Sequence, residues 1–209
     1  MSGRPKLSVL RFGEDRCWQA RVRAVAATIC EWETLEYGPG KQRKTDQLVA
    51  CLEKSRSAGL VCAFVGDEIV AYSDVWSLET EFYERLKRGI EPEETLEPDC
   101  IRSSFASHEP NYYVGSVIVS PRLRSAQPAR SAVIFREITA GIGALLKQHA
   151  AFPARMLGVG FSPLGEKLLR HFGFTPVSRA ADAVDHRPRF EKCMLAAANA
   201  DCFMLANAG

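Results

Sequence analysis

The segment of the chain best suited to bind a charged group is a short arginine-rich stretch, PRLRSAQPARSAV, at residues 121–133. It lies between an apolar run that ends at Val119 and a helical pattern that begins near Pro128. A loop here would bring backbone N–H groups to a helix N-terminus, which attracts anions. The segment therefore predicts an anion site. The ordinary alternative is a helix start with solvated arginines.

A second stretch, GVGFSPLG at residues 158–165, resembles two catalytic or binding motifs and fits neither. A nucleophile elbow uses the N–H of the residue after its serine for the oxyanion hole. After Ser162 that residue is Pro163, which has no N–H. A dinucleotide fingerprint would need glycine at the same position. The sequence therefore argues against both a serine hydrolase and a dinucleotide-binding site at this place.

Histidine and cysteine give no sign of a metal site. The four histidines have no metal-ligand spacing, so we expect no metal cofactor. The seven cysteines are odd in number, have no C-x-x-C spacing and lie mostly in apolar segments. They are typical of small buried side chains in a reducing compartment.

Bulk composition narrows the class of protein. A chain of 209 residues with 46% hydrophobic content is ordinary for one globular domain. Its 27 basic and 25 acidic residues leave a formal charge of +2, which provides no general attraction to nucleic acid or to an anionic membrane. The sequence has no apolar run long enough to span a bilayer and no signal peptide, so we expect a cytoplasmic protein.

Hydrophobic periodicity and turn residues predict alternating strands and helices. The expected elements, in order, are a strand at 7–12, a helix from Glu14, a helix after a Thr45 cap, a hairpin around Gly66 and Asp67, an insertion at about 79–110, a buried strand at 112–119, a helix at about 128–149, a buried strand at 154–161, a helix closed by Gly173 and a final strand pair. An extra C-terminal tail from about residue 197 could pack back on the body or mediate a homodimer.

In element order and in residues 113–174 the sequence resembles the GNAT family of acyl-CoA-dependent N-acyltransferases. The family's central strand ends V-x-P-x-Y-R, and VSPRLR fits with Leu123 in place of the tyrosine. Its pyrophosphate loop, [Q/R]-x-x-G-x-[G/A], corresponds to RSAQPA, which Arg124 opens and Ala129 closes. Gln127 occupies the position of the central glycine, and Pro128 removes one N–H.

The second family segment, N-x-x-A-x-x-L-Y-x-x-x-G-F, corresponds to SPLGEKLLRHFGF from Ser162 to Phe174. In the family the asparagine contacts the pantetheine arm of the cofactor, and the tyrosine often protonates the leaving thiolate. Ser162 keeps a hydrogen-bonding group at the asparagine position. Leu169, at the tyrosine position, cannot donate a proton.

The resemblance implies a single domain over residues 1–209 of the α+β class. The expected architecture is a three-layer α/β/α arrangement, with a mixed, mostly antiparallel central sheet, a splayed strand pair and flanking helices. It also implies acetyl-CoA or another acyl-CoA as co-substrate and an amine acceptor. The cofactor-binding positions that it implies are Val117, Val119, Arg124, Ser125, Ala126, Gln127, Ala129, Arg130 and Ser162.

For the base that deprotonates the attacking amine, the nearest candidates are Tyr113 at the start of the central strand, and His108 and Glu109 just before it. Of these we take Tyr113 as the catalytic prediction, although a packed aromatic is its alternative role. Acidic residues of the insertion could favour a cationic acceptor or form a solvated face: Glu79, Glu81, Glu84, Glu91, Glu93 and Glu94.

Three functional hypotheses remain open from the sequence. The first is an acyl-CoA-dependent N-acyltransferase that works by direct transfer in a ternary complex. The second is a catalytically impaired GNAT-fold module that binds CoA or another protein, which Gln127, Pro128 and Leu169 favour. The third is an unrelated α/β protein, in which the strands of Val117 and Val159 would not splay.

Overall fold

The computed structural model describes residues 7–11, 18–39, 44–55, 59–105 and 110–203. Its strands are β1 (Leu7–Arg11), β2 (Leu60–Val65), β3 (Glu68–Ser77), β4 (Asn111–Val119), β5 (Ala154–Val159), β6 (Thr175–Ser178) and β7 (Arg189–Met194). Its α-helices are α1 (Trp18–Tyr37), α2 (Thr45–Lys54), α3 (Thr80–Lys87), α4 (Pro121–Ala126), α5 (Pro128–His149) and α6 (Pro163–His171). Short 3₁₀ helices are η2 (Glu93–Thr95), η3 (Pro98–Cys100), η4 (Ala180–Asp182) and η5 (Ala197–Phe203).

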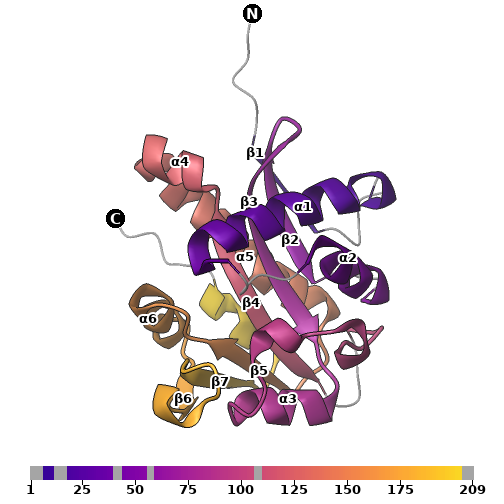
Figure 1. The fold of residues 1–209 in the computed structure, drawn as a ribbon, viewed down its shortest axis with the longest axis vertical. Coiled ribbons are helices and arrows are strands. Elements are labelled where there is room, and N and C mark those ends of the chain that lie inside the picture. The colour runs from indigo at the N-terminus through magenta and orange to yellow at the C-terminus, as the bar shows by residue number, and fades with distance from the viewer. Residues whose placement is uncertain (1–6, 12–17, 40–43, 56–58, 106–109, 204–209) are drawn as a thin grey trace, which may run out of the picture.

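The strands form one sheet in the order β1-β2-β3-β4-β5-β7-β6 (Figure 1). Every neighbouring pair is antiparallel except β4 and β5, which run parallel. The antiparallel pairing of β2 with β3 confirms the predicted hairpin. Gly66 at its turn takes φ +65°, a conformation that glycine adopts without steric cost. The mixed, mostly antiparallel sheet that the sequence predicted is therefore present.

The two central strands pair over only part of their length. Residues Asn111–Val114 of β4 pair with Arg155–Gly158 of β5, and β4 then continues to Val119 without a partner on that side. Beyond Gly158, Val159 pairs with Arg189 of β7 instead. The strands of Val117 and Val159 therefore splay, as the resemblance implied, whereas an unrelated α/β protein was expected to lack the splay.

A bulge in β4 lies at the point where the splay begins. Val75 of β3 pairs with Val114, while Ser73 pairs with Val117, so Gly115 and Ser116 together face the single residue Asp74. An inserted residue of this kind bends a strand and interrupts its ladder. The bulge turns β4 away from β5 and opens the sheet.

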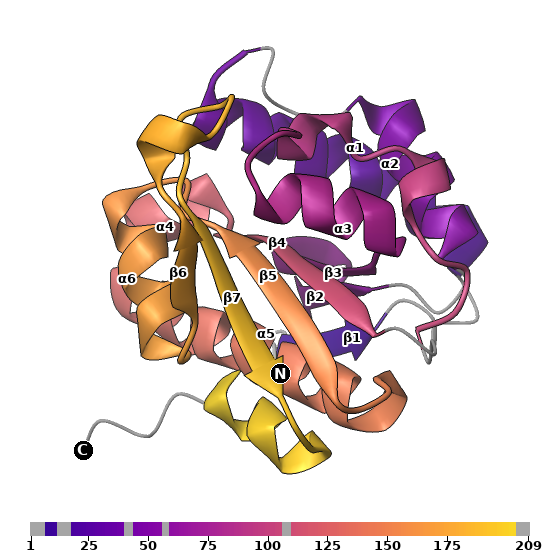
Figure 2. The same ribbon diagram turned by 90° about the horizontal axis from the view of Figure 1, so that it is seen from below.

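Helices cover both faces of the sheet and give the three layers that the sequence predicted. In Figure 2, α1, α2 and α3 lie above the sheet, while the long α5 lies below it. Each face has its own apolar cluster, one including Ile29 and Trp76, the other including Ile138 and Phe190. Since burial of apolar surface is the main favourable term in folding, the two clusters hold the splayed strands in a fixed scaffold.

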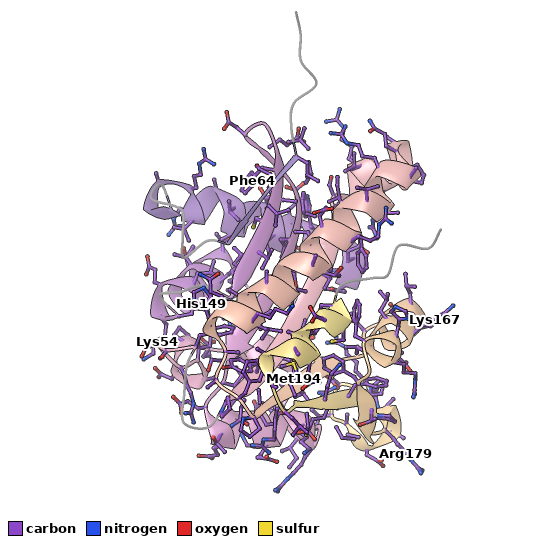
Figure 3. The ribbon with its side chains drawn as sticks, turned by 180° about the vertical axis from the view of Figure 1, so that it is seen from behind. Lys54, Phe64, His149, Lys167, Arg179 and Met194 are labelled. Atoms are coloured by element: carbon purple, nitrogen blue, oxygen red, sulfur yellow. The ribbon has the colours of Figure 1, made fainter. Side chains whose placement is uncertain are left out.

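The segment predicted as an insertion is built from α3, η2 and η3, and α3 buries Phe82, Tyr83 and Leu86. At the other end of the chain, η5 packs back on the body, which is one of the two roles predicted for the tail. Figure 3 shows η5 in yellow beside α5 and next to Met194. Gly143 permits this contact, because a Cβ there would lie 2.8 Å from the carbonyl oxygen of Ala200.

Within the described ranges, no helix combines the length and the apolar character that a bilayer crossing requires. In the same ranges no group of three or more histidine, cysteine or acidic side chains is arranged to hold a metal ion.

Candidate active site

A cleft of about 940 Å³ lies where β4 and β5 separate. Val117 and Val119 of β4 line one wall, and Val159 and Phe161 line the other. Arg124, Ser131 and Phe135 line the end nearer the start of α5, and Ser162, Leu168 and Leu169 line the side toward α6. Among the residues that the structure describes, the backbone of β4 beyond Val114 has no strand partner on the β5 side, so an amide-bearing ligand could pair with it as an added strand.

The segment after β4 is helical, which corrects the predicted loop. Residues Pro121–Ala126 form α4, and the Gln127 N–H donates to the Leu123 carbonyl at 2.8 Å. Proline at the first helical position and good helix formers after it explain α4, and Pro128 ends it because proline disfavours helical geometry in the preceding residue. The Gln127 N–H is therefore already used within the protein.

Within the described part of the chain, two backbone donors at the N-terminus of α5 have no hydrogen-bond acceptor. No side chain caps α5, and its first residue is Pro128. The Ser131 N–H donates to the Gln127 carbonyl at 3.0 Å, so the N–H groups of Ala129 and Arg130 are the ones without an intrahelical acceptor. Together with the helix dipole they make this terminus attractive to an anion.

The structure separates the predicted cofactor residues into two groups. Val117, Val119, Arg124 and Ser162 line the cleft. Ser125, Ala126, Gln127, Ala129 and Arg130 are exposed at the α4–α5 junction, outside the cleft lining. The Arg124 guanidinium pairs with Glu36, and Arg130 donates to the Gln127 side chain at 3.3 Å. Cofactor binding by either group stays a prediction.

Ser162 and Leu169 have clear structural roles. The Ser162 Oγ accepts the Gly165 N–H at 3.1 Å and caps α6, an arrangement that leaves its own O–H free to donate. Leu169 packs on β5, because a Cβ added to Gly158 would come within 2.5 Å of its Cδ2. The side of the cleft toward α6 thus has a serine hydroxyl and no tyrosine.

A second, much smaller cavity adjoins the bulge on the other side of β4. Its volume of about 20 Å³ is enough for roughly one water molecule. Acidic and phenolic side chains make up most of its wall: Glu33, Tyr37, Asp74, Glu93, Glu94 and Tyr113, with Leu96, Gly115 and Ser116 completing it. Tyr37, Gly115 and Ser116 line both cavities, so the two spaces meet at the bulge.

A buried carboxylate holds the bulge in place. Asp74 is 1% exposed, and its Oδ1 accepts the Ser116 N–H at 2.8 Å while its Oδ2 accepts the Trp76 indole N–H at 2.7 Å. Gly115 allows this approach, because a Cβ there would lie 2.5 Å from the same Oδ1. The backbone where the two cavities meet is therefore fixed by a charged hydrogen bond.

Tyr113, the predicted catalytic residue, lies in the wall of the small cavity. It is 4% exposed, and its hydroxyl donates to Glu93. The structure thus brings it beside the bulge, although a catalytic role stays a prediction. The other two candidate bases, His108 and Glu109, lie outside the described residues.

Sequence reasoning missed Tyr37, the last residue of α1. Its hydroxyl lies 3.0 Å from the Ser116 Oγ, and its ring centroid lies 3.9 Å from that of Phe161. The Arg187 guanidinium lies 3.6 Å from the centroid of Phe161. Burial raises the pKa of Tyr37 far above its usual value, so its phenol is neutral at physiological pH. No motif marks the end of an amphipathic helix, and only the fold brings Tyr37 to Ser116.

The comparisons with known proteins agree with this architecture. No protein-family model matches the sequence, and no curated protein matches it. Among solved structures, two GNAT-family acetyltransferases match over 90% of this chain and 99% of theirs, both with a TM-score of 0.51. The one from Staphylococcus aureus Mu50 is 10% identical, and the one from Streptococcus pneumoniae is 9% identical. The chain has the GNAT fold.

A third structure, PH1933 from Pyrococcus horikoshii OT3, is 15% identical, with a TM-score of 0.51 over 90% of this chain and 99% of that one. At these identities the GNAT likeness concerns the backbone fold alone.

Proposed function

We propose that this GNAT-fold protein is an acyl-CoA-dependent N-acyltransferase that transfers an acyl group directly to an amine. The observation that supports it most is the meeting of two cavities at the bulge of β4. A long cleft suited to an extended donor reaches Gly115 and Ser116 from one side, and a small acidic cavity reaches them from the other. Donor and acceptor bound in this way would have their reacting atoms side by side, which accounts for much of the acceleration in such reactions.

The residues of the cleft fit the chemical parts of CoA. The unpartnered edge of β4 at Val117 and Val119 offers backbone groups to the amides of the pantetheine arm. The Ser162 O–H can donate to one of their carbonyls. Outside the cleft lining, at the start of α5, the N–H groups of Ala129 and Arg130 and the Arg130 side chain suit the diphosphate, together with Arg124 of the cleft. The donor itself would supply the activated carbonyl and a thiolate leaving group.

The small cavity suits the ammonium group of a cationic amine, because it admits about one water-sized group and its wall is acidic. Glu33 and Asp74 are 3% and 1% exposed, and Glu93 and Glu94 complete the acidic wall. Arg187 offsets part of this charge through Glu93 at 3.2 Å and Glu94 at 2.8 Å. The other acids of the predicted insertion pair elsewhere: Glu79 with Arg102, Glu81 and Glu91 with Arg85, and Glu84 with Arg155.

The same wall offers a route for the amine proton. Before attack, an ammonium must lose one proton, and a carboxylate within reach directly or through one water can accept it. An ammonium group in this cavity would take the space of about one water and lie beside the carboxylates of Glu33, Asp74 and Glu93. We propose that these groups relay the proton outward, and that Tyr113 orients Glu93 through their hydrogen bond.

A second candidate function is CoA binding without catalysis. Leu169 has no hydroxyl, whereas the family often has a tyrosine there that protonates the leaving thiolate. The helix α4 replaces the loop expected around a diphosphate. Such a module would bind CoA and release no thiol in the presence of any amine.

Thiol release from acetyl-CoA distinguishes the two functions. The protein would be mixed with acetyl-CoA and a panel of diamines, polyamines, amino acids and lysine peptides, and free thiol would be followed colorimetrically. The enzyme hypothesis predicts saturable release with at least one cationic amine. Saturable CoA binding with no release above the protein-free rate across the panel would favour the binding module.

A further inference from the structure

An acyltransferase with Leu169 in its cleft needs another donor for the sulfur that leaves. As the C–S bond of a thioester breaks, negative charge develops on sulfur, and a placed hydrogen-bond donor stabilises that charge. Leu169 has no donor group. We propose that the phenol O–H of Tyr37 donates a hydrogen bond to the departing thiolate, an inference that rests on the proposed function.

The position of Tyr37 supports this role. It lines both cavities, together with Gly115 and Ser116, and therefore stands where a donor thioester would meet the acceptor. The Ser116 O–H can donate to the Tyr37 oxygen at 3.0 Å, which leaves the Tyr37 O–H to donate to sulfur, and the Tyr37 ring lies 3.9 Å from that of Phe161 between centroids. When charge develops, a donor whose orientation is fixed before the reaction spends little free energy on reorganisation.

Other groups at the junction are less suitable. The Tyr113 hydroxyl is already committed to Glu93. The charged groups that face Tyr37 are carboxylates, namely Glu33 on its own helix, Asp74 on β3 and Glu93 on η2, and a carboxylate cannot stabilise a thiolate. Arg187 lies against Phe161, and Glu36 of the cleft wall pairs with Arg124. The neutral phenol, kept protonated by burial, is the suitable donor.

The proposed step is balanced in atoms and charge. The neutral amine attacks the thioester carbonyl carbon, a C–N bond forms and the C–S bond breaks. The C–S electron pair goes to sulfur, which leaves as a thiolate bonded by the Tyr37 O–H. The nitrogen, which is positively charged after the attack, gives one of its two protons to the carboxylates of the small cavity. Tyr37 keeps its own proton throughout, so it needs no regeneration.

Bound CoA tests this contact without any acceptor amine. A thiolate absorbs ultraviolet light that a thiol does not, so a pH titration of the saturated CoA complex gives the pKa of the bound thiol. The same titration with desulfo-CoA subtracts the protein's own cysteines and tyrosines. A hydrogen bond to the charged form lowers a pKa. We therefore expect the bound thiol's pKa to be about one to two units higher in Tyr37→Phe than in the wild type.

Ser116→Ala is the matched control, because it removes the neighbouring hydroxyl and keeps the phenol. We expect it to shift the bound thiol's pKa less than Tyr37→Phe does. A fluorinated tyrosine at position 37 makes the phenol a stronger donor and should lower the thiol's pKa below the wild-type value. This variant replaces Tyr37→Phe in the test if Tyr37→Phe does not fold.

The outcomes distinguish a failure of the proposed function from a failure of the Tyr37 contact alone. If the wild-type protein binds no CoA, the proposed function fails and this inference fails with it. If it binds CoA and the thiol's pKa is the same in wild type and Tyr37→Phe, the Tyr37 contact alone is refuted. A shift in Ser116→Ala with none in Tyr37→Phe would assign the contact to the serine and also overturn the inference.

Discussion

Single residues at the bulge of β4 determine both its shape and its chemistry. Asp74 binds the Ser116 N–H and the Trp76 indole N–H, while Tyr37 reaches Ser116 from the end of α1. Neither residue belongs to a motif. Asp74 lies within a strand that is buried from Ile69 to Ser77, and Tyr37 is the last residue of a helix, so only tertiary structure reveals them. Ser162 was singled out because it opens the second family segment, and Tyr113 because it lies at the start of the central strand, and the roles of both stay predictions.

The Asp74→Asn change tests the bulge at the residue scale. An amide can still accept one N–H, but its NH₂ group then meets the second donor, and one buried donor loses its acceptor. We expect the free energy of unfolding in urea to fall by about 1–3 kcal/mol. Asp67→Asn is the control, because Asp67 is 98% exposed in its side chain and pairs with Arg21 only at the surface. An equal, negligible effect of both changes would show that Asp74 does not hold the bulge.

At the scale of elements, the sequence predicted the order of strands and helices and the splay of β4 from β5. It predicted a loop between the strand end at Val119 and the helix start near Pro128, where α4 forms instead. Without glycine at position 127, the backbone has no residue suited to a tight phosphate-cradling turn, and PRLRSA closes its own helical hydrogen bonds instead. The bulge was also missed, since Gly115 alone does not signal one.

Gly115→Ala tests whether β4 needs a glycine at the bulge. The added Cβ would lie 2.5 Å from the Asp74 Oδ1, so either the buried carboxylate or the strand must shift. Overpacking of this kind typically costs about 1–3 kcal/mol. Gly165→Ala in α6 is the control, because its Cβ would meet only the Ser162 Oγ at an ordinary 3.4 Å. Thermal unfolding should show a lower midpoint for the first variant and an unchanged or higher one for the second; a wild-type midpoint for Gly115→Ala would contradict the clash.

At the scale of the whole molecule, two apolar clusters on opposite faces keep the splayed sheet rigid. The resemblance to the GNAT family implied this three-layer arrangement, and the structure has it. The sequence left the role of the C-terminal tail open between packing and dimer formation. The structure buries Ala200 and Phe203 of η5 against α5, with the Phe203 ring 5.2 Å from that of Phe172. Burial of this segment could not be read from a tail without clear periodicity.

Phe203→Ala tests the contribution of η5. Removing a fully buried phenylalanine side chain costs about 3–5 kcal/mol through lost burial and a residual cavity. Leu195→Ala is the control, since Leu195 is 78% exposed and should change stability by less than about 0.5 kcal/mol. Chemical denaturation of both variants measures the difference. If Phe203→Ala unfolds at the wild-type denaturant concentration, η5 does not stabilise the domain.

The most direct test of the proposed function is a calorimetric titration of acetyl-CoA into three proteins: the wild type, Val117→Trp and Val133→Trp. Val117 lines the cleft on β4, so an indole there would fill the proposed pantetheine path. Val133 on α5 is 42% exposed and lies outside the cleft lining, so it receives the same substitution as a control. We predict equal affinity for the wild type and Val133→Trp, and affinity weaker by at least about tenfold for Val117→Trp. Absence of binding to the wild type, or unchanged affinity in Val117→Trp, would contradict acyl-CoA binding between the splayed strands.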